Sequence, residues 1–198
     1  MKNSVTIRHG IAAAGVLVLL LAGCTAEPLA EQYAEGSGQG YISGDGAIVE
    51  IAPSDRDAPI EFSGADENGR TIASEDFLGS VYVVNFWYAS CPPCRAEASD
   101  LKALSEEYTD VPFLGVNTYD SAQTALSFAR EFGIEYPSIM DAATAQVQLA
   151  FAGSVPPNAV PTTLVVDRDG RVAARISGLI REASILASII DTVVAEDQ

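Results

Sequence analysis

The sequence predicts an α/β domain with a mixed central sheet flanked by helices. Two apolar runs, 81–88 and 111–116, have the nearly uninterrupted hydrophobicity of buried strands. Each is followed by a stretch with helical spacing of its apolar residues, and a hairpin and a last helix close the chain. Strands that alternate with helices favour parallel pairing, and the hairpin adds antiparallel strands. The part with these patterns, about 145 residues, suits one domain.

The first predicted elements form an N-terminal β-hairpin. Two short apolar segments, 60–62 and 70–72, flank a turn that contains Asn68-Gly69. This dipeptide is typical of a tight hairpin connection. Residues 74–79 follow as a short helical turn or loop.

The run 81–88 is the strongest strand, and we expect it to be central and covered on both faces. A helix follows and ends near Tyr108. Its residues Leu101, Leu104 and Tyr108 share one face. Counting back four residues from Leu101 gives Glu97, which places an acidic side chain on the face that packs on the core.

The later elements are predicted by the same patterns. In order, they are a strand at 111–116, a helix at 121–132, an Ala-rich helix at 142–151, strands at 162–166 and 171–176 around an Asp-Arg-Asp-Gly turn, and a helix at 181–194.

Residues 1–23 have the features of a signal peptide. Lys2 and Arg8 precede an apolar run at 11–21 that is too short for a comfortable membrane span. The segment Leu-Ala-Gly-Cys that ends at Cys24 resembles a bacterial lipobox. This resemblance implies cleavage before Cys24, a diacylglycerol on its sulfur, and attachment to the outer face of the cytoplasmic membrane. The alternative is an ordinary secretory signal with an incidental cysteine.

The segment 24–55 is predicted to be a flexible tether. It is rich in Gly, Glu and Gln, a composition that suits coil more than core. The sequence therefore divides into a lipoprotein signal peptide at 1–23, the lipid-anchored tether at 24–55 and a domain at 56–198.

The composition excludes several classes of function. The chain has 11 basic and 27 acidic residues; losing Lys2 and Arg8 with the signal leaves nine basic residues and a net charge of −18. Such a charge argues against binding to nucleic acid or directly to anionic lipid. The one histidine, His9, also lies in the signal, so the mature chain lacks Cys-His or Ser-His catalysis and His-ligated zinc or copper. We expect no metal site.

The sequence Cys91-Pro92-Pro93-Cys94 lies between the strand at 81–88 and its helix. Once Cys24 carries lipid, Cys91 and Cys94 have only each other as disulfide partners. A loop this short stabilises a fold little, which favours a redox role over a structural one. We expect Cys91 to be exposed at the turn, where the helix dipole favours the thiolate. Both prolines are compatible with the first helical turn.

These motifs resemble a known family. A cysteine pair on a strand-to-helix turn, followed later by Val160-Pro161-Thr162-Thr163, resembles the thioredoxin fold. More narrowly, Asn85-Phe86-Trp87 before the pair and Arg95-Ala96-Glu97 after it resemble the TlpA/ResA/DsbE-like branch of membrane-tethered extracytoplasmic thioredoxins, over roughly residues 56–195. The stretch between the 121–132 helix and Pro161 resembles the insertion of that branch, which implies an inserted helix.

The resemblance implies roles for individual residues. Cys91 is the attacking cysteine and Cys94 resolves the mixed disulfide. Pro161 corresponds to the cis-proline of the family, and Val160 offers backbone hydrogen bonds to the partner; Pro156 and Pro157 are alternatives for the cis position. Glu97 corresponds to an acidic residue near the active site, a proton acceptor for Cys94. The alternative for Glu97 is a carboxylate that reaches water from the edge of the apolar stripe.

The resemblance also implies a substrate-binding surface formed by Trp87, Pro92, Pro93, Val160 and Pro161. We interpret Trp87 as a core or rim residue of this surface.

Two positions depart from the family pattern. Asn85 stands where many cytosolic thioredoxins carry a buried Asp, and Ser90 where the branch usually has Trp. The second departure leaves the first cysteine more open on one side.

The predicted function is thiol–disulfide exchange outside the cytoplasmic membrane, with no cofactor besides the Cys91–Cys94 disulfide. The resemblance implies protein clients such as apocytochrome c and a membrane thiol donor that re-reduces the pair. The alternatives are an oxidase that forms disulfides in secreted proteins and a non-catalytic binding lipoprotein. A peroxidase is disfavoured because the Pro-x-x-x-Thr-x-x-Cys arrangement is absent before Cys91.

Overall fold

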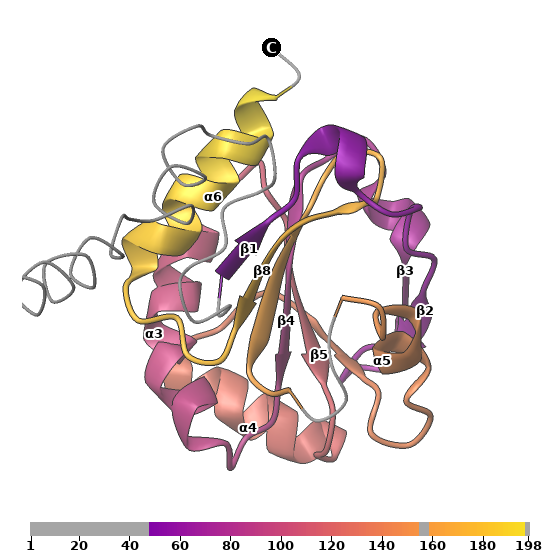
Figure 1. The fold of residues 1–198 in the computed structure, drawn as a ribbon. Coiled ribbons are helices and arrows are strands. Elements are labelled where there is room, and N and C mark those ends of the chain that lie inside the picture. The colour runs from indigo at the N-terminus through magenta and orange to yellow at the C-terminus, as the bar shows by residue number, and fades with distance from the viewer. Residues whose placement is uncertain (1–47, 155–158, 197–198) are drawn as a thin grey trace, which may run out of the picture. The chain divides into compact units, whose positions relative to one another are not determined.

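The computed structural model describes residues 48–154 and 159–196. Six of its strands form one mixed sheet in the order β1-β8-β7-β4-β5-β6 (Figure 1). They are β1 (Ile48–Glu50), β4 (Tyr82–Trp87), β5 (Phe113–Asn117), β6 (Ser138–Met140), β7 (Thr162–Val166) and β8 (Val172–Ser177). The pairs β4–β5 and β5–β6 are parallel, and the others are antiparallel. The predicted mixed α/β fold is confirmed.

Strand β4 is central, as predicted, and all six of its residues are buried. Its side chains alternate between two cores, as the pleat requires. Val83 packs on one face of the sheet with the helical layer, and Tyr82, Val84 and Phe86 pack on the other.

Three helices cover the first face: α3 (Pro92–Glu107), α4 (Ala122–Phe132) and α6 (Ala183–Ala195) (Figure 1). The apolar stripe of α3 packs with that of α6, through Leu101, Leu104, Leu186 and Ile190. These helices lie within one or two residues of their predicted bounds, because long periodic segments carry a strong signal. None of the described helices is both long enough and apolar enough to cross a membrane.

The second face is covered by the β2–β3 hairpin and by α5 (Figure 1). The predicted hairpin forms, with β2 (Ser63–Ala65) antiparallel to β3 (Thr71–Ala73), but its first strand begins after the predicted segment 60–62. The short helix η2 (Ser74–Phe77) follows. Gly69 has a φ of 80°, the left-handed conformation that the turn requires and glycine adopts easily.

The inserted helix is shorter than predicted. Helix α5 (Gln146–Ala150) has five residues, whereas the Ala-rich pattern predicted 142–151. The buried carboxylate of Asp141 accepts hydrogen bonds from the backbone N–H groups of Val147 and Gln148. This holds the preceding residues in a turn, in which Ala145 has a φ of 53°. Strand β6 before this turn was not predicted.

The prediction of a tether through residue 55 is wrong for residues 48–55. Strand β1 pairs with β8, with Ile48 opposite Ile176, and the Ile51 N–H donates to the Ala173 carbonyl at 2.7 Å. The short helix η1 (Pro53–Asp55) follows. The apolar residues of this segment pair with the sheet, whereas the Gly-rich composition that suggested a tether lies before them. Residues 1–47, with Cys24, lie outside the described part of the chain.

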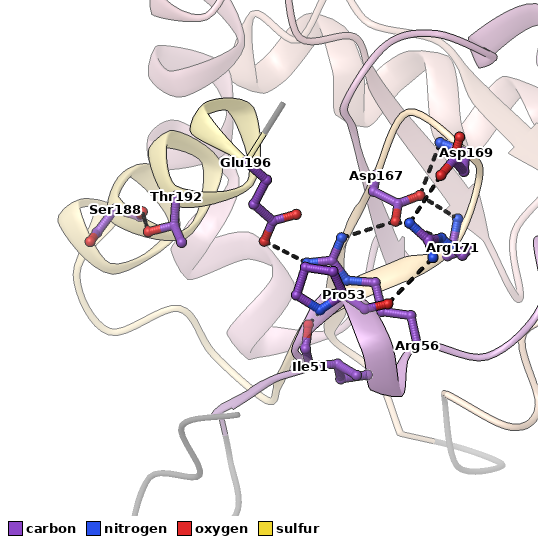
Figure 2. A network of polar contacts seen from close by, with 9 residues as sticks. All are labelled: Ile51, Pro53, Arg56, Asp167, Asp169, Arg171, Ser188, Thr192 and Glu196. Atoms are coloured by element: carbon purple, nitrogen blue, oxygen red, sulfur yellow. Dashed lines mark hydrogen bonds and ion pairs between the residues drawn. The ribbon is translucent and has the colours of Figure 1, made fainter. Parts of the chain in front are cut away.

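Arg56 connects the segment 48–55 to the rest of the domain through hydrogen bonds and ion pairs (Figure 2). Its side chain is 2% exposed, and its guanidinium donates to Asp167 in the β7–β8 turn at 2.9 Å and to Glu196 after α6 at 2.6 Å. Its Nε donates to the Ile51 carbonyl at 3.0 Å. The side chain therefore joins three parts of the chain that are far apart in sequence.

Candidate active site

A disulfide joins Cys91 and Cys94 at the start of α3. Strand β4 ends at Trp87, and a turn closed by the Cys91 N–H and the Tyr88 carbonyl leads into the helix. Cys91 is the N-cap, and its Sγ accepts a hydrogen bond from the Cys94 N–H at 3.2 Å. The helix N-terminus thus supplies an N–H donor and the positive end of its dipole to the Cys91 sulfur.

Both cysteines are buried, which corrects the prediction that Cys91 is exposed. Cys91 is 1% exposed and Cys94 3%. They belong to a cluster with Trp87, Ala98, Ala125 and Phe128, against which Tyr88, Ala89 and Val160 also pack. The turn and the helix alone predicted exposure, whereas side chains distant in sequence, such as Phe128 and Val160, pack in the cluster that contains both cysteines. Pro92 is exposed and Pro93 half-buried.

The Val160–Pro161 peptide bond is cis, as expected for Pro161. Pro161 is buried, and its carbonyl accepts a hydrogen bond from the Gly178 N–H at 2.8 Å. Val160 is half-buried and packs against the cluster that contains the disulfide. The other two candidates, Pro156 and Pro157, lie outside the described residues.

Trp87 is a core residue. Its side chain packs on Phe128 with the ring centroids 4.4 Å apart, and its Nε1–H donates to the Ser138 Oγ at 3.2 Å. With 6% of its surface exposed, it lies behind the disulfide and offers little area to a substrate. The predicted substrate-binding group therefore divides into buried Trp87 and Pro161 and the more accessible Pro92, Pro93 and Val160.

Glu97 lies one turn after Cys94 in α3 and is 1% exposed. Its Oε1 accepts from the Asn85 Nδ2 at 3.0 Å, and its Oε2 accepts from the Ile180 N–H at 3.0 Å. The alternative of a carboxylate that reaches water is therefore wrong.

Burial raises the pKa of Glu97 to about 7, from an ordinary value of 4.5. The hydrogen bonds from Ile180 and Asn85 lower the pKa, and the nearby charge of Asp100 raises it. Desolvation is the largest of these effects. A carboxyl group with such a pKa exchanges protons readily near neutral pH.

Asn85 has a role that the sequence did not reveal. Its Nδ2 donates to both Glu97 and the Thr163 Oγ1, each at 3.0 Å, so it links β4, α3 and β7. Asn85 and Cys94 also line one cavity of about 20 Å³, enough for a single water molecule. The available signal was a single amide side chain inside an apolar strand, because a buried polar group needs partners.

The described residues contain no cluster of three or more His, Cys, Asp or Glu side chains that could hold a metal ion. Their chemistry at this site is that of a cystine, a carboxyl group of raised pKa and backbone donors.

Residues 55–175 match the AhpC/TSA family. The chain belongs to this family. Its curated relatives include the thiol-disulfide oxidoreductase ResA of Geobacillus thermodenitrificans, 31% identical over 63% of this chain and 70% of the relative. The thiol:disulfide interchange protein DsbE homolog of Paracoccus denitrificans is 31% identical over 76% of this chain and 81% of the relative.

Solved structures agree with this AhpC/TSA assignment. A DsbF homologue from Corynebacterium diphtheriae is 29% identical, with a TM-score of 0.66 over 78% of this chain and 98% of that one. A secreted thiol-disulfide isomerase from Corynebacterium glutamicum is 30% identical, with a TM-score of 0.67 over 77% and 97% of the two chains. This AhpC/TSA chain is therefore a thiol–disulfide oxidoreductase of the ResA and DsbE type with the thioredoxin fold, which confirms the predicted fold and branch.

Proposed function

We propose that Cys91 and Cys94 are the redox pair of an extracytoplasmic enzyme that reduces disulfides in client proteins. The observation that carries the proposal is the disulfide itself, capped by the N-terminus of α3 and followed one turn later by buried Glu97. This arrangement supplies a sulfur whose anion is stabilised and a nearby group that exchanges protons.

In the reduced enzyme, the Cys91 thiolate attacks one sulfur of the client disulfide. A bond forms between that sulfur and Cys91, the client S–S bond breaks, and the second client sulfur leaves as a thiolate. The Cys94 thiolate then attacks the Cys91 Sγ, which forms the Cys91–Cys94 disulfide and releases the first client sulfur. Two electrons pass from the enzyme to the client. Glu97 accepts the proton that Cys94 loses before its attack.

Val160 and Pro92 complete the proposed site. In this proposal the Val160 backbone, next to the cis peptide bond, pairs with the client chain, and Pro92 lies at the exposed side of the turn. No cofactor besides the cysteine pair takes part.

We further propose an apocytochrome c client, a membrane thiol donor and attachment to the outer face of the cytoplasmic membrane through Cys24. The resemblance to the TlpA/ResA/DsbE-like branch supports these assignments, and a solved relative described as secreted supports the location outside the cytoplasm. The second candidate, a disulfide-forming oxidase, uses the same residues in reverse. Direction depends on the reduction potential of the pair relative to its donor.

Because both sulfurs are buried, reactivity of the oxidised protein is the first test. Dithiothreitol is expected to reduce the Cys91–Cys94 disulfide, and the reduced protein to reduce insulin. The variant Cys91→Ala should lose insulin reduction completely. A disulfide that resists dithiothreitol, or insulin reduction retained in Cys91→Ala, would contradict the proposal and favour a non-catalytic binding protein.

Two further measurements identify the client and the direction. The variant Cys94→Ala should accumulate mixed disulfides with clients, which mass spectrometry identifies. Trp87, the only tryptophan, packs in the same cluster as the disulfide, so its emission should report a glutathione redox titration. A strongly reducing potential supports the reductase, and an oxidising one supports the oxidase.

A further inference from the structure

Four large apolar side chains are at least 41% exposed in the described part of the chain: Leu78, Tyr119, Leu149 and Leu179. Tyr119 is the most exposed, at 77%. A single exposed apolar residue is ordinary on a protein surface, so its position decides whether it has a role.

Tyr119 is held beside the loop that leads into the disulfide. On one side of it, the Thr118 N–H donates to the Trp87 carbonyl at 3.1 Å. On the other, the Asp120 carboxylate accepts from the Ala89 N–H at 2.6 Å and from the Asn117 Nδ2 at 2.9 Å. The β5–α4 loop is therefore hydrogen-bonded to the loop before Cys91 on both sides of Tyr119. These bonds position the backbone of Tyr119 beside that loop.

Tyr119 and Tyr88 form an aromatic pair at this position, with ring centroids 5.9 Å apart. Tyr88 lies three residues before Cys91 and packs against the disulfide cluster. Ser90, which is exposed, precedes Cys91 at the position where the TlpA/ResA/DsbE-like branch usually has Trp. An aromatic surface is thus present beside the cysteine, but it comes from two other positions.

The loop on the cis-proline side also presents an apolar group. Leu179, 41% exposed, lies between Gly178, whose N–H donates to the Pro161 carbonyl, and Ile180, whose N–H donates to Glu97. Tyr119 and Leu179 are therefore each attached to one of the two loops that pack against the disulfide.

The charged groups of the Tyr88–Tyr119 neighbourhood already have partners. Both contacts of the Asp120 carboxylate are internal. The Arg95 guanidinium pairs with Glu131, bonds the Ala89 carbonyl and lies over the ring of Phe132. What this surface offers to a client is two tyrosine rings, which suit an apolar side chain better than an acidic one.

We propose that Tyr119 and Tyr88 bind an apolar side chain next to the reacting cysteine of the client, so that the enzyme prefers disulfides flanked by aromatic or aliphatic residues. This inference rests on the proposed function and adds a specificity determinant to it. Tyrosine is among the residue types that contribute most to binding between proteins.

The test compares two peptide disulfides that differ only in Phe or Ser beside one cysteine. The second-order rate constant for reduction by the reduced enzyme is measured for each peptide and divided by that for hydroxyethyl disulfide, which has no side chain to bind. The wild type should prefer the Phe peptide by about five-fold, the scale of one aromatic contact. Tyr119→Ala should lose most of this preference.

Leu149→Ala is the matched control, since Leu149 is 69% exposed in α5 and belongs to neither loop beside the disulfide. It should keep the wild-type preference. An undiminished preference in Tyr119→Ala, or equal rates of the wild type with both peptides, would overturn the inference. A wild type that reduces neither peptide nor hydroxyethyl disulfide would instead overturn the proposed function.

Discussion

Glu97 is a carboxyl group with both oxygens hydrogen-bonded and almost no contact with water. Its ionisation is decided by a competition in which burial favours the neutral form and the N–H donors of Ile180 and Asn85 favour the anion. Burial is the larger effect, and the pKa rises to about 7. In the proposed function the same group accepts the proton of Cys94, and its raised pKa makes the stability of the fold depend on pH.

Glu97 should make the oxidised protein less stable as the pH rises. With a pKa of about 7 in the folded state and 4.5 when exposed, the folded chain binds more protons than the unfolded chain between these values. The stabilisation, on the order of 3 kcal/mol, is present below pH 4.5 and is lost as the pH rises through 7. Urea unfolding of wild type and Glu97→Gln across this range measures the difference.

The free energies of unfolding of wild type and Glu97→Gln should diverge as the pH rises from 4.5 to 7, where only the wild type loses this stabilisation, and the difference should level off above pH 7. Parallel profiles would show that folding does not raise the pKa of Glu97. In the reduced protein, Glu97→Gln should also slow disulfide exchange near neutral pH, because Cys94 loses its proton acceptor. An unchanged pH–rate profile would contradict that role.

At this scale, the sequence identified the cysteines, Pro161 and the inward position of Glu97. Helical counting from Leu101 was enough for Glu97, since its orientation follows from the period of the helix. The Asn85 contacts were not predictable, because they depend on a register that places Asn85 opposite Thr163. The burial of Cys91 depends likewise on loops distant in sequence.

At the scale of secondary structure, strand β5 packs tightly against Ser138 and Trp87 at Gly115. A Cβ there would lie 2.1 Å from the Ser138 Oγ and 2.8 Å from the Trp87 Nε1. These two atoms form the hydrogen bond that fixes Trp87 behind the disulfide. The absence of a side chain at this strand position is therefore a packing requirement.

Gly115→Ala should destabilise the protein by about 1–3 kcal/mol, as expected for overpacking of a core. It should also shift the emission of Trp87, since its indole N–H must move away from Ser138. Gly153→Ala is the control, because no atom lies within 4 Å of its added Cβ. Equal urea midpoints for the two variants would show that the sheet accommodates the methyl group.

The long helices were predictable from their periodicity, whereas the short strands β1 and β6 were not. Helices α3, α4 and α6 contain several turns of periodic apolar residues, so their bounds followed from pattern. Strands β1 and β6 have three residues each, too few for a period to appear. What defines them is pairing, with β8 in one case and β5 in the other.

Over the whole molecule, Arg56 holds together segments separated by more than a hundred residues (Figure 2). Arg56→Met should lower the free energy of unfolding by about 1–3 kcal/mol. This is less than the loss of about 3–5 kcal/mol that is typical when a buried charge is left without any partner. The reason is that Asp167 keeps the Arg171 guanidinium and the backbone N–H groups of Asp169 and Arg171.

Lys102→Met provides the comparison, since its pair with Glu106 is a surface pair worth at most about 0.5 kcal/mol. The urea midpoint of Arg56→Met should therefore fall clearly below that of Lys102→Met. Similar midpoints would show that the buried ion pairs contribute no more than surface ones.

The proposed lipid anchor is testable in cells. Cys24→Ser should move the protein from the membrane fraction to the soluble fraction, while the domain keeps its disulfide exchange. Fractionation followed by insulin reduction measures both. Retention of Cys24→Ser in the membrane fraction would contradict lipidation as the means of attachment.

The order of the sheet has a mechanical consequence. Whatever precedes Ile48 joins the domain at β1, and β8 and β7 separate β1 from β4, the strand that leads to Cys91. A force transmitted along the backbone would act on the edge strand β1 and on the contacts of Arg56 before it reached the cysteines. Tension on the chain before Ile48 would therefore load β1 and its contacts with β8 before it reached Cys91 and Cys94.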